Sequence, residues 1–175
     1  MTKNDVSLKA VFRRARTAIE SEYGIAVAIC DVLDPNTGSF DGARIEIDFA
    51  CDLEMSLFVL IHLFGHTVQW NLHPPYRTID QRVKVGADSA TIAEAMRYEK
   101  EASRYGIQLL HQCGVHQLDQ WVSDWWASDW SYLSHYYRTG ILGDWKDFRG
   151  ATSTPLEPVP IPPFTPHAWF VRYAF

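Results

Sequence analysis

Two histidines four residues apart, His62 and His66, are the residues of this sequence best placed to do chemistry. On a helix this spacing puts both side chains on one face, where they can bind a single metal ion. The residues from Phe58 to Phe64 are otherwise apolar, so the segment is expected to be buried. A buried imidazole needs a polar partner. A shared metal would serve both histidines; hydrogen bonds to backbone carbonyls are the alternative.

A carboxylate in the next predicted helix, residues 90–112, is the third candidate ligand. An apolar stripe runs along this helix from Ile92 to Leu110, and Glu99 is the only charged residue on it. Glu101 is expected to point almost the opposite way. A lone carboxylate on a buried face is costly unless it is paired or bound to metal. Facing the histidines, Glu99 would complete a ligand set with an open coordination position; an ion pair with Lys or Arg is the alternative.

The elements that must position these residues follow from periodicity and from turn signals. Apolar spacing predicts helices, and alternation or short apolar runs predict strands. The expected class is α+β, with a small antiparallel or mixed sheet packed on three or more helices. The expected helices cover residues 7–23, 53–71, 90–112 and 118–138, and the expected strands cover residues 25–33, 43–49 and 167–175.

The strand predicted at residues 43–49 alternates apolar and acidic side chains, with Glu46 and Asp48 on its polar face. Such alternation is typical of a half-exposed strand, which we expect at the edge of the sheet. An edge strand can pair with an extended peptide. Glu46 and Asp48 therefore mark a possible peptide-binding strand.

The last third of the chain is rich in aromatic residues and then in proline. The helix at residues 118–138 carries four tryptophans, which could form a core contact, a substrate wall or a dimer surface. After Gly150 six prolines indicate an extended arm. We expect a metal-binding domain at residues 1–150 and an arm with a terminal strand at residues 151–175. The arm or the aromatic helix could join two copies as a homodimer.

Bulk composition narrows the function classes. The net charge is −5 without a long basic run, which argues against nucleic-acid binding. The N-terminus has no apolar signal sequence, and the longest apolar stretch is too short to span a bilayer. Three cysteines without CxxC spacing fit reduced thiols. A cytoplasmic protein that does not enter membranes is expected.

Two runs of residues resemble a known family. Residues 62–66 read His-Leu-Phe-Gly-His, and residues 99–106 read Glu-Lys-Glu-Ala-Ser-Arg-Tyr-Gly. With the order of predicted elements, these runs resemble the ImmA/IrrE zinc metallopeptidases, which carry His-Glu-Leu-Gly-His and then a Glu-x-Glu-Ala-Asn-x-Phe-Ala-like run. The resemblance covers roughly residues 10–112. It implies a zincin-like minimal metallopeptidase fold, bound zinc, and Glu99 as third ligand.

Two departures from the family pattern bear on activity. Leu63 stands where the family has its general-base glutamate, which takes a proton from the attacking water. Leucine cannot do this, and losing such a group typically lowers the rate ~10²–10⁴-fold. Ser103 stands where the family has Asn or Asp, a residue that steadies a histidine ligand. A serine hydroxyl can still form that hydrogen bond.

Three functions remain open. The protein could be a pseudopeptidase whose metal supports a partner-binding cleft. It could instead run Lewis-acid or non-haem Fe(II) chemistry, because two histidines and a carboxylate suit iron as well as zinc. In the third reading another acid replaces the missing base; Glu46, Asp48 and Glu54 are nearby in sequence, but Glu54 lies two turns before His62 and is expected to point elsewhere. His73, seven residues after His66, is interpreted as a loop residue.

Overall fold

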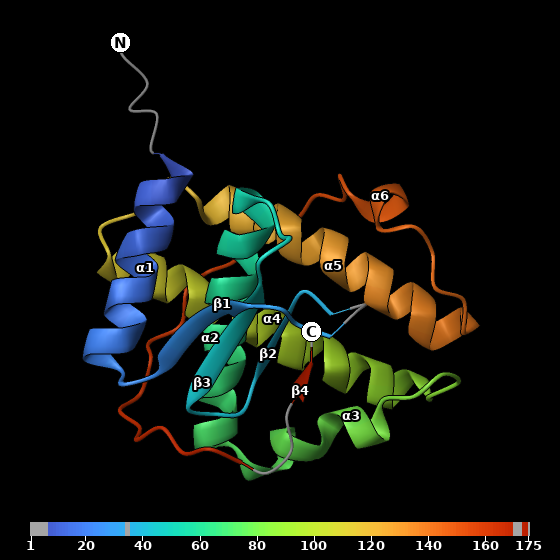
Figure 1. The fold of residues 1–175 in the computed structure, drawn as a ribbon. Coiled ribbons are helices and arrows are strands. Elements are labelled where there is room, and N and C mark those ends of the chain that lie inside the picture. The colour runs from blue at the N-terminus through green and yellow to red at the C-terminus, as the bar shows by residue number, and fades with distance from the viewer. Residues whose placement is uncertain (1–6, 34–35, 170–172, 175) are drawn as a thin grey trace.

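The described part of the chain combines helices with a small mixed sheet, which lies in front of α2 and α4 in Figure 1, so the α+β class is confirmed. The computed structural model describes residues 7–33, 36–169 and 173–174. The elements are α1 (Leu8–Glu22), β1 (Ala26–Cys30), β2 (Gly38–Phe40), β3 (Arg44–Asp48), α2 (Leu53–Leu72), the 3-10 helix η1 (Pro74–Thr78), α3 (Ile79–Arg82), α4 (Ser89–Gln112), α5 (Asp119–Thr139), α6 (Trp145–Phe148) and β4 (Tyr173–Ala174). Among the described residues, no helix is both long and apolar enough to cross a bilayer.

The sheet order is β1-β3-β2-β4, with β1 parallel to β3 and the other two pairs antiparallel. The prediction that residues 43–49 form an edge strand is therefore wrong, because β3 has a neighbour on each side. Its alternation reflects two differently covered faces: Ile45 and Ile47 are fully buried, while Glu46 and Asp48 are half-buried. The expected strand at residues 167–175 lies partly outside the described residues, and β4 is the part observed.

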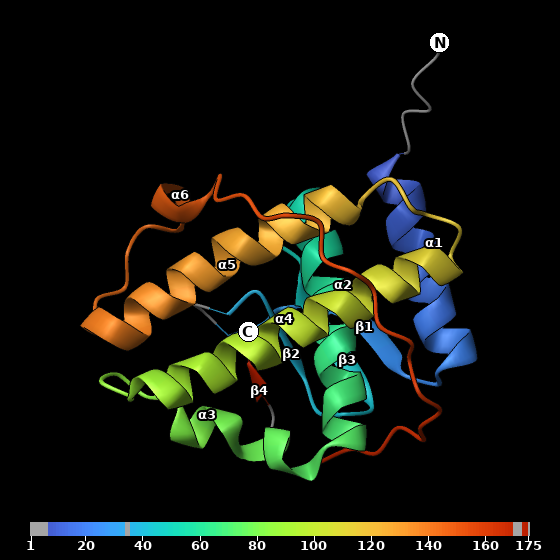
Figure 2. The same ribbon diagram turned by 180° about the vertical axis from the view of Figure 1, so that it is seen from behind.

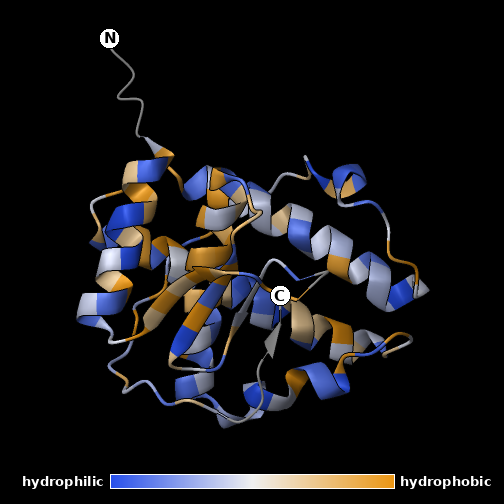
Figure 3. Ribbon diagram, in the orientation of Figure 1, coloured by the Kyte–Doolittle hydropathy of each residue, from blue (hydrophilic) through white to orange (hydrophobic). Residues whose placement is uncertain are grey.

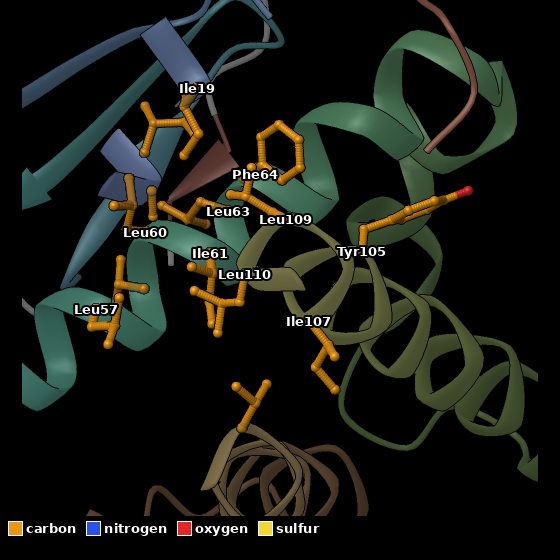
Figure 4. Close-up of a cluster of buried hydrophobic side chains, with 14 of the residues drawn as sticks. Ile19, Leu57, Leu60, Ile61, Leu63, Phe64, Tyr105, Ile107, Leu109 and Leu110 are labelled. Carbon is orange, nitrogen blue, oxygen red and sulfur yellow. The ribbon is translucent and has the colours of Figure 1, made fainter. Parts of the chain in front are cut away.

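Helix α2 forms the centre of the core. Asp52 begins it by accepting a hydrogen bond from the Met55 backbone N–H. From Leu57 to Trp70 every residue is buried, so the helix is covered on all sides by the rest of the chain. Figure 4 shows the apolar side chains of α2 packing among those of α1 and α4. Helix α1, by contrast, carries alternating apolar and polar bands and covers one side of the core (Figure 3).

Two glycines let α2 and α4 approach closely. A Cβ atom at Gly65 would overlap the backbone of Ala102, and one at Gly106 would lie 2.9 Å from the carbonyl oxygen of Ile61. The backbone of α2 therefore contacts that of α4 at Ile61 and at Gly65, which lie before and after His62 in the sequence. This contact sets the distance between the histidines of α2 and the acidic residues of α4.

Residues 151–169 have no regular secondary structure and run along the back of their own chain, across α5 and α4 (Figure 2). Leu156 is buried, and its N–H donates to the Ser123 hydroxyl at 2.8 Å. Arg104 of α4 donates to the carbonyl oxygen of Glu157 at 2.7 Å. The segment thus covers the core of the chain to which it belongs; the expected homodimer stays a prediction.

Replacing Gly65 by Ala tests the close helix contact. Alanine normally favours a helix over glycine by ~1 kcal/mol. Here the added methyl group would force α2 and α4 apart, so we expect a net loss of about 1–3 kcal/mol in the free energy of unfolding. Urea denaturation measures it. Gly106→Ala, with its looser contact, should cost less, and a Gly65→Ala protein as stable as the parent would contradict the packing described.

Candidate metal centre

The three predicted ligands converge at one point in the core. His62 Nε2 lies 3.0 Å and His66 Nε2 lies 3.2 Å from Glu99 Oε2, and the two nitrogens are 3.0 Å apart. Both histidines are fully buried and Glu99 is 5% exposed. Two imidazole nitrogens and a carboxylate oxygen at this separation are a donor set that fits one divalent ion. Glu99 thus contacts the two histidines, in place of the Lys or Arg that the alternative required.

The backs of both imidazole rings are held by hydrogen bonds. Ser103 Oγ lies 3.1 Å from His62 Nδ1, the contact expected of the residue at that position. Gln69 Oε1 lies 2.9 Å from His66 Nδ1, and the Gln69 amide donates to the Tyr98 carbonyl oxygen. Because this donation fixes Gln69 Oε1 as the acceptor, His66 Nδ1 carries the ring proton. His66 Nε2 therefore carries a lone pair, which faces the point where the three candidate ligand atoms meet, called the ligand point below.

Glu101 also supports this arrangement, a role that the sequence did not indicate. It was expected to point away from the site. Its carboxylate instead accepts a second hydrogen bond from the Gln69 amide at 2.8 Å. A chain of contacts thus runs from Glu101 through Gln69 to His66, and it adds negative charge behind that imidazole.

The protonation states of the ligands suit metal binding. Burial lowers the pKa of His62 to about 4, helped by the nearby His66 and opposed by Glu99. Burial alone would raise the pKa of Glu99, but the charges and hydrogen bonds of the two histidines lower it to about 2. At neutral pH His62 is neutral and Glu99 is ionised. These are the forms that bind a metal cation.

Leu63, which stands where the resembling family has its general-base glutamate, is a packed core residue. Leu63 is fully buried among the apolar side chains of α2, α1 and α4 (Figure 4). On its other side it presses against β2, where a Cβ added to Gly38 would lie 2.9 Å from Leu63 Cδ1. Leu63 offers no proton acceptor to the ligand point.

The acids considered as substitutes for that base are engaged elsewhere. Glu46 pairs with Arg44 at 2.9 Å and accepts from Ser39 at 2.8 Å. Asp48 accepts hydrogen bonds from backbone N–H groups beside its strand. Glu54 is half-buried and faces the Arg149 guanidinium at 3.3 Å. Among the described residues, the cluster of ligand atoms contains none of the three.

His73 also lies outside the cluster. It follows the last residue of α2, is exposed, and contacts the ring of Tyr76. The interpretation of His73 as a non-ligand residue after the helix agrees with this position.

A second buried acid, Asp129 of α5, was missed. It is 8% exposed, and its Oδ2 has no hydrogen-bond partner among the described residues. Burial raises the pKa of Asp129 well above the usual range, and the Glu99 charge raises it further. The signal was present in the sequence: Asp129 is the only charge on the α5 stripe that contains Val122, Trp126 and Leu133. The reasoning that selected Glu99 on α4 also selects Asp129 here.

Glu99 and Asp129 both line one cavity of about 420 Å³. Most of its wall is aromatic or aliphatic and comes from α5, α6 and the start of α2. The Trp125 ring stacks on Phe58 at 5.2 Å between centroids, and Phe58 stacks on His62 at 5.2 Å. The aromatic helix therefore contributes both to the core, through Trp126, and to the cavity wall, through Trp125.

The chain matches none of the protein-family models, curated proteins or solved structures with which it was compared.

The buried Asp129 carboxyl predicts a pH-dependent loss of stability. Its pKa is raised in the folded protein and is ~3.9 in the unfolded chain, so the folded state holds the proton more tightly. As pH rises above ~4, metal-free parent protein should lose ~1.4 kcal/mol per pH unit relative to Asp129→Asn, until the raised folded pKa is passed. Urea denaturation between pH 4 and pH 8 measures the difference.

The exposed Asp147 provides the matched control for this measurement. Asp147→Asn makes the same chemical change outside the core, so its stability should follow that of the parent at every pH. Parallel curves for Asp129→Asn and the parent would show that Asp129 is not buried in its neutral form.

Proposed function

We propose that this protein binds one zinc ion through His62, His66 and Glu99, on a scaffold related to the ImmA/IrrE metallopeptidases. The observation that carries the proposal is the convergence of two Nε2 atoms and one carboxylate oxygen, within 3.2 Å of one another, inside an apolar core. Burying these three groups together is costly unless something offsets the lost hydration. A divalent cation does so and leaves a coordination position for a ligand.

The residues around the centre act mainly as supports. Ser103 and Gln69 orient the two imidazoles, so that their Nε2 lone pairs meet at the ligand point. Glu99 supplies the negative charge. When bound, a zinc ion would polarise a carbonyl or similar oxygen of a ligand in the cavity. The protein side of the site is thus built for binding and polarisation.

Peptide hydrolysis by the family's standard mechanism is not part of this proposal. That mechanism needs a proton acceptor at position 63, and Leu63 is an apolar core residue. We therefore infer a pseudopeptidase with respect to that mechanism, a protein whose metal centre binds a ligand or partner. The route for the partner is the cavity beside Glu99, because β3 is already paired on both sides.

The same donor set also serves non-haem Fe(II) enzymes, so metal identity separates the two classes. The protein is purified without chelators or an affinity metal, beside Glu99→Ala and Glu94→Ala. Glu94 lies on the same helix but pairs with Arg82 near the surface, which makes it the matched control. Elemental analysis should find close to one zinc per chain in the parent and in Glu94→Ala, and at least tenfold weaker retention in Glu99→Ala.

Iron in place of zinc would redirect the proposal to oxygen chemistry. A folded parent protein that takes up neither metal, even when each is supplied in excess, would contradict it. His62, His66 and Glu99 would then be core residues that hydrogen-bond only to one another.

A further inference from the structure

The cavity beside the candidate metal centre has an outer wall that is not needed to hold His62, His66 and Glu99 in place. Its outer wall is formed by residues 125–145, on α5, α6 and the segment between them. These residues lie outside the part of the chain that resembles a peptidase. Trp125 also stacks against Trp145 of α6, with ring centroids 6.0 Å apart, so both helices help to build the wall.

Asp129 is a polar residue of this wall with a buried oxygen atom, Oδ2, that has no hydrogen-bond partner among the described residues. The residue is more than nine-tenths buried and lines the cavity. An unsatisfied buried carboxyl oxygen costs stability, and native proteins keep such groups mainly where function needs them. In either protonation state this oxygen can accept a hydrogen bond.

The polar groups in the wall limit what can bind. Two carboxyl groups, those of Glu99 and Asp129, face the cavity, and none of its described lining residues is Lys, Arg or His. A ligand that relies on a phosphate or sulfate group would meet no cation of the protein here. An uncharged molecule with an apolar or aromatic body fits the stacked rings of Trp125 and Trp145.

We propose that this cavity binds a small uncharged ligand with an aromatic or aliphatic body, and that Asp129 accepts a hydrogen bond from an N–H or O–H group of that ligand. Asp129 is then a positioning residue, which turns the polar end of the ligand toward Glu99 and the histidines. The inference rests on the proposed function only in assigning Glu99 to the metal; the wall and Asp129 do not depend on it.

Two hydroxamic acids test this inference on the full-length, zinc-loaded protein. Benzohydroxamic acid has an aryl body and a polar head that binds zinc after its O–H loses the proton and still keeps an N–H donor; acetohydroxamic acid has the same head without the ring. Calorimetric titration should give at least about tenfold tighter binding for the aryl compound, because the ring is removed from water. Equal affinities would show that the cavity does not take up the ring and would overturn the inference.

Asp129→Leu tests the hydrogen bond. It should weaken benzohydroxamic acid binding about tenfold, while Asp147→Asn leaves the affinity unchanged. Thermal unfolding should show Asp129→Leu at least as stable as the parent, since an unpaired buried carboxyl is removed. An unchanged affinity would remove Asp129 from the site. Reduced stability with unchanged affinity would make its role purely structural.

Zinc content, measured on the same samples, separates failure of this inference from failure of the proposed function. Stoichiometric zinc with no preference for the aryl compound overturns the inference alone. If zinc is not retained, the proposed function fails, and the metal-free protein is titrated with benzamide while the tryptophan indole N–H resonances are followed by NMR. Shifts in the parent that are lost in Asp129→Leu would support the inference, and no shifts would overturn it.

Discussion

Two imidazoles and a carboxylate meet inside an apolar core. Their burial costs free energy because they lose hydration, and the rest of the structure must hold them together despite that cost. The histidines come from α2, whose central residues are all buried. Glu99 comes from α4, which reaches α2 because Gly65 and Gly106 leave room for backbone contact. Helix α5 and the extended residues that follow α6 cover α4 from outside. Removing the partner of any one of these polar groups would leave a buried group unsatisfied.

The three candidate ligands could be predicted because the periodicity of apolar residues shows which face of a helix is buried. The four-residue spacing of His62 and His66, and the lone charge of Glu99 on an apolar stripe, indicated a shared site. The extents of α2, α4 and α5 followed from the same periodicity. The contact of Ser103 with His62 was expected from the family resemblance.

Other features depend on tertiary contacts that local pattern does not report. The three-residue strand β2 lies between the strands expected at residues 25–33 and 43–49, where no element was predicted, and its pairing moves β3 from the edge to the interior of the sheet. The bond between Gln69 and Glu101 depends on how α2 crosses α4. Asp129 lies on an apolar stripe as Glu99 does, but the tryptophans around it equally fit a helix that packs in the core. The zincin-like fold, the partner and the homodimer remain proposals.

X-ray absorption spectroscopy at the zinc edge tests the central claim most directly, because it reports the ligand atoms themselves. For zinc-loaded protein the account predicts only nitrogen and oxygen neighbours near 2.0–2.1 Å, with outer-shell scattering from two imidazole rings. The Glu99→Ala variant should lose one oxygen ligand or fail to hold the ion. Sulfur neighbours near 2.3 Å would mean that cysteines bind the zinc. That result, or the absence of imidazole scattering, would contradict the assignment of His62, His66 and Glu99 as the metal site.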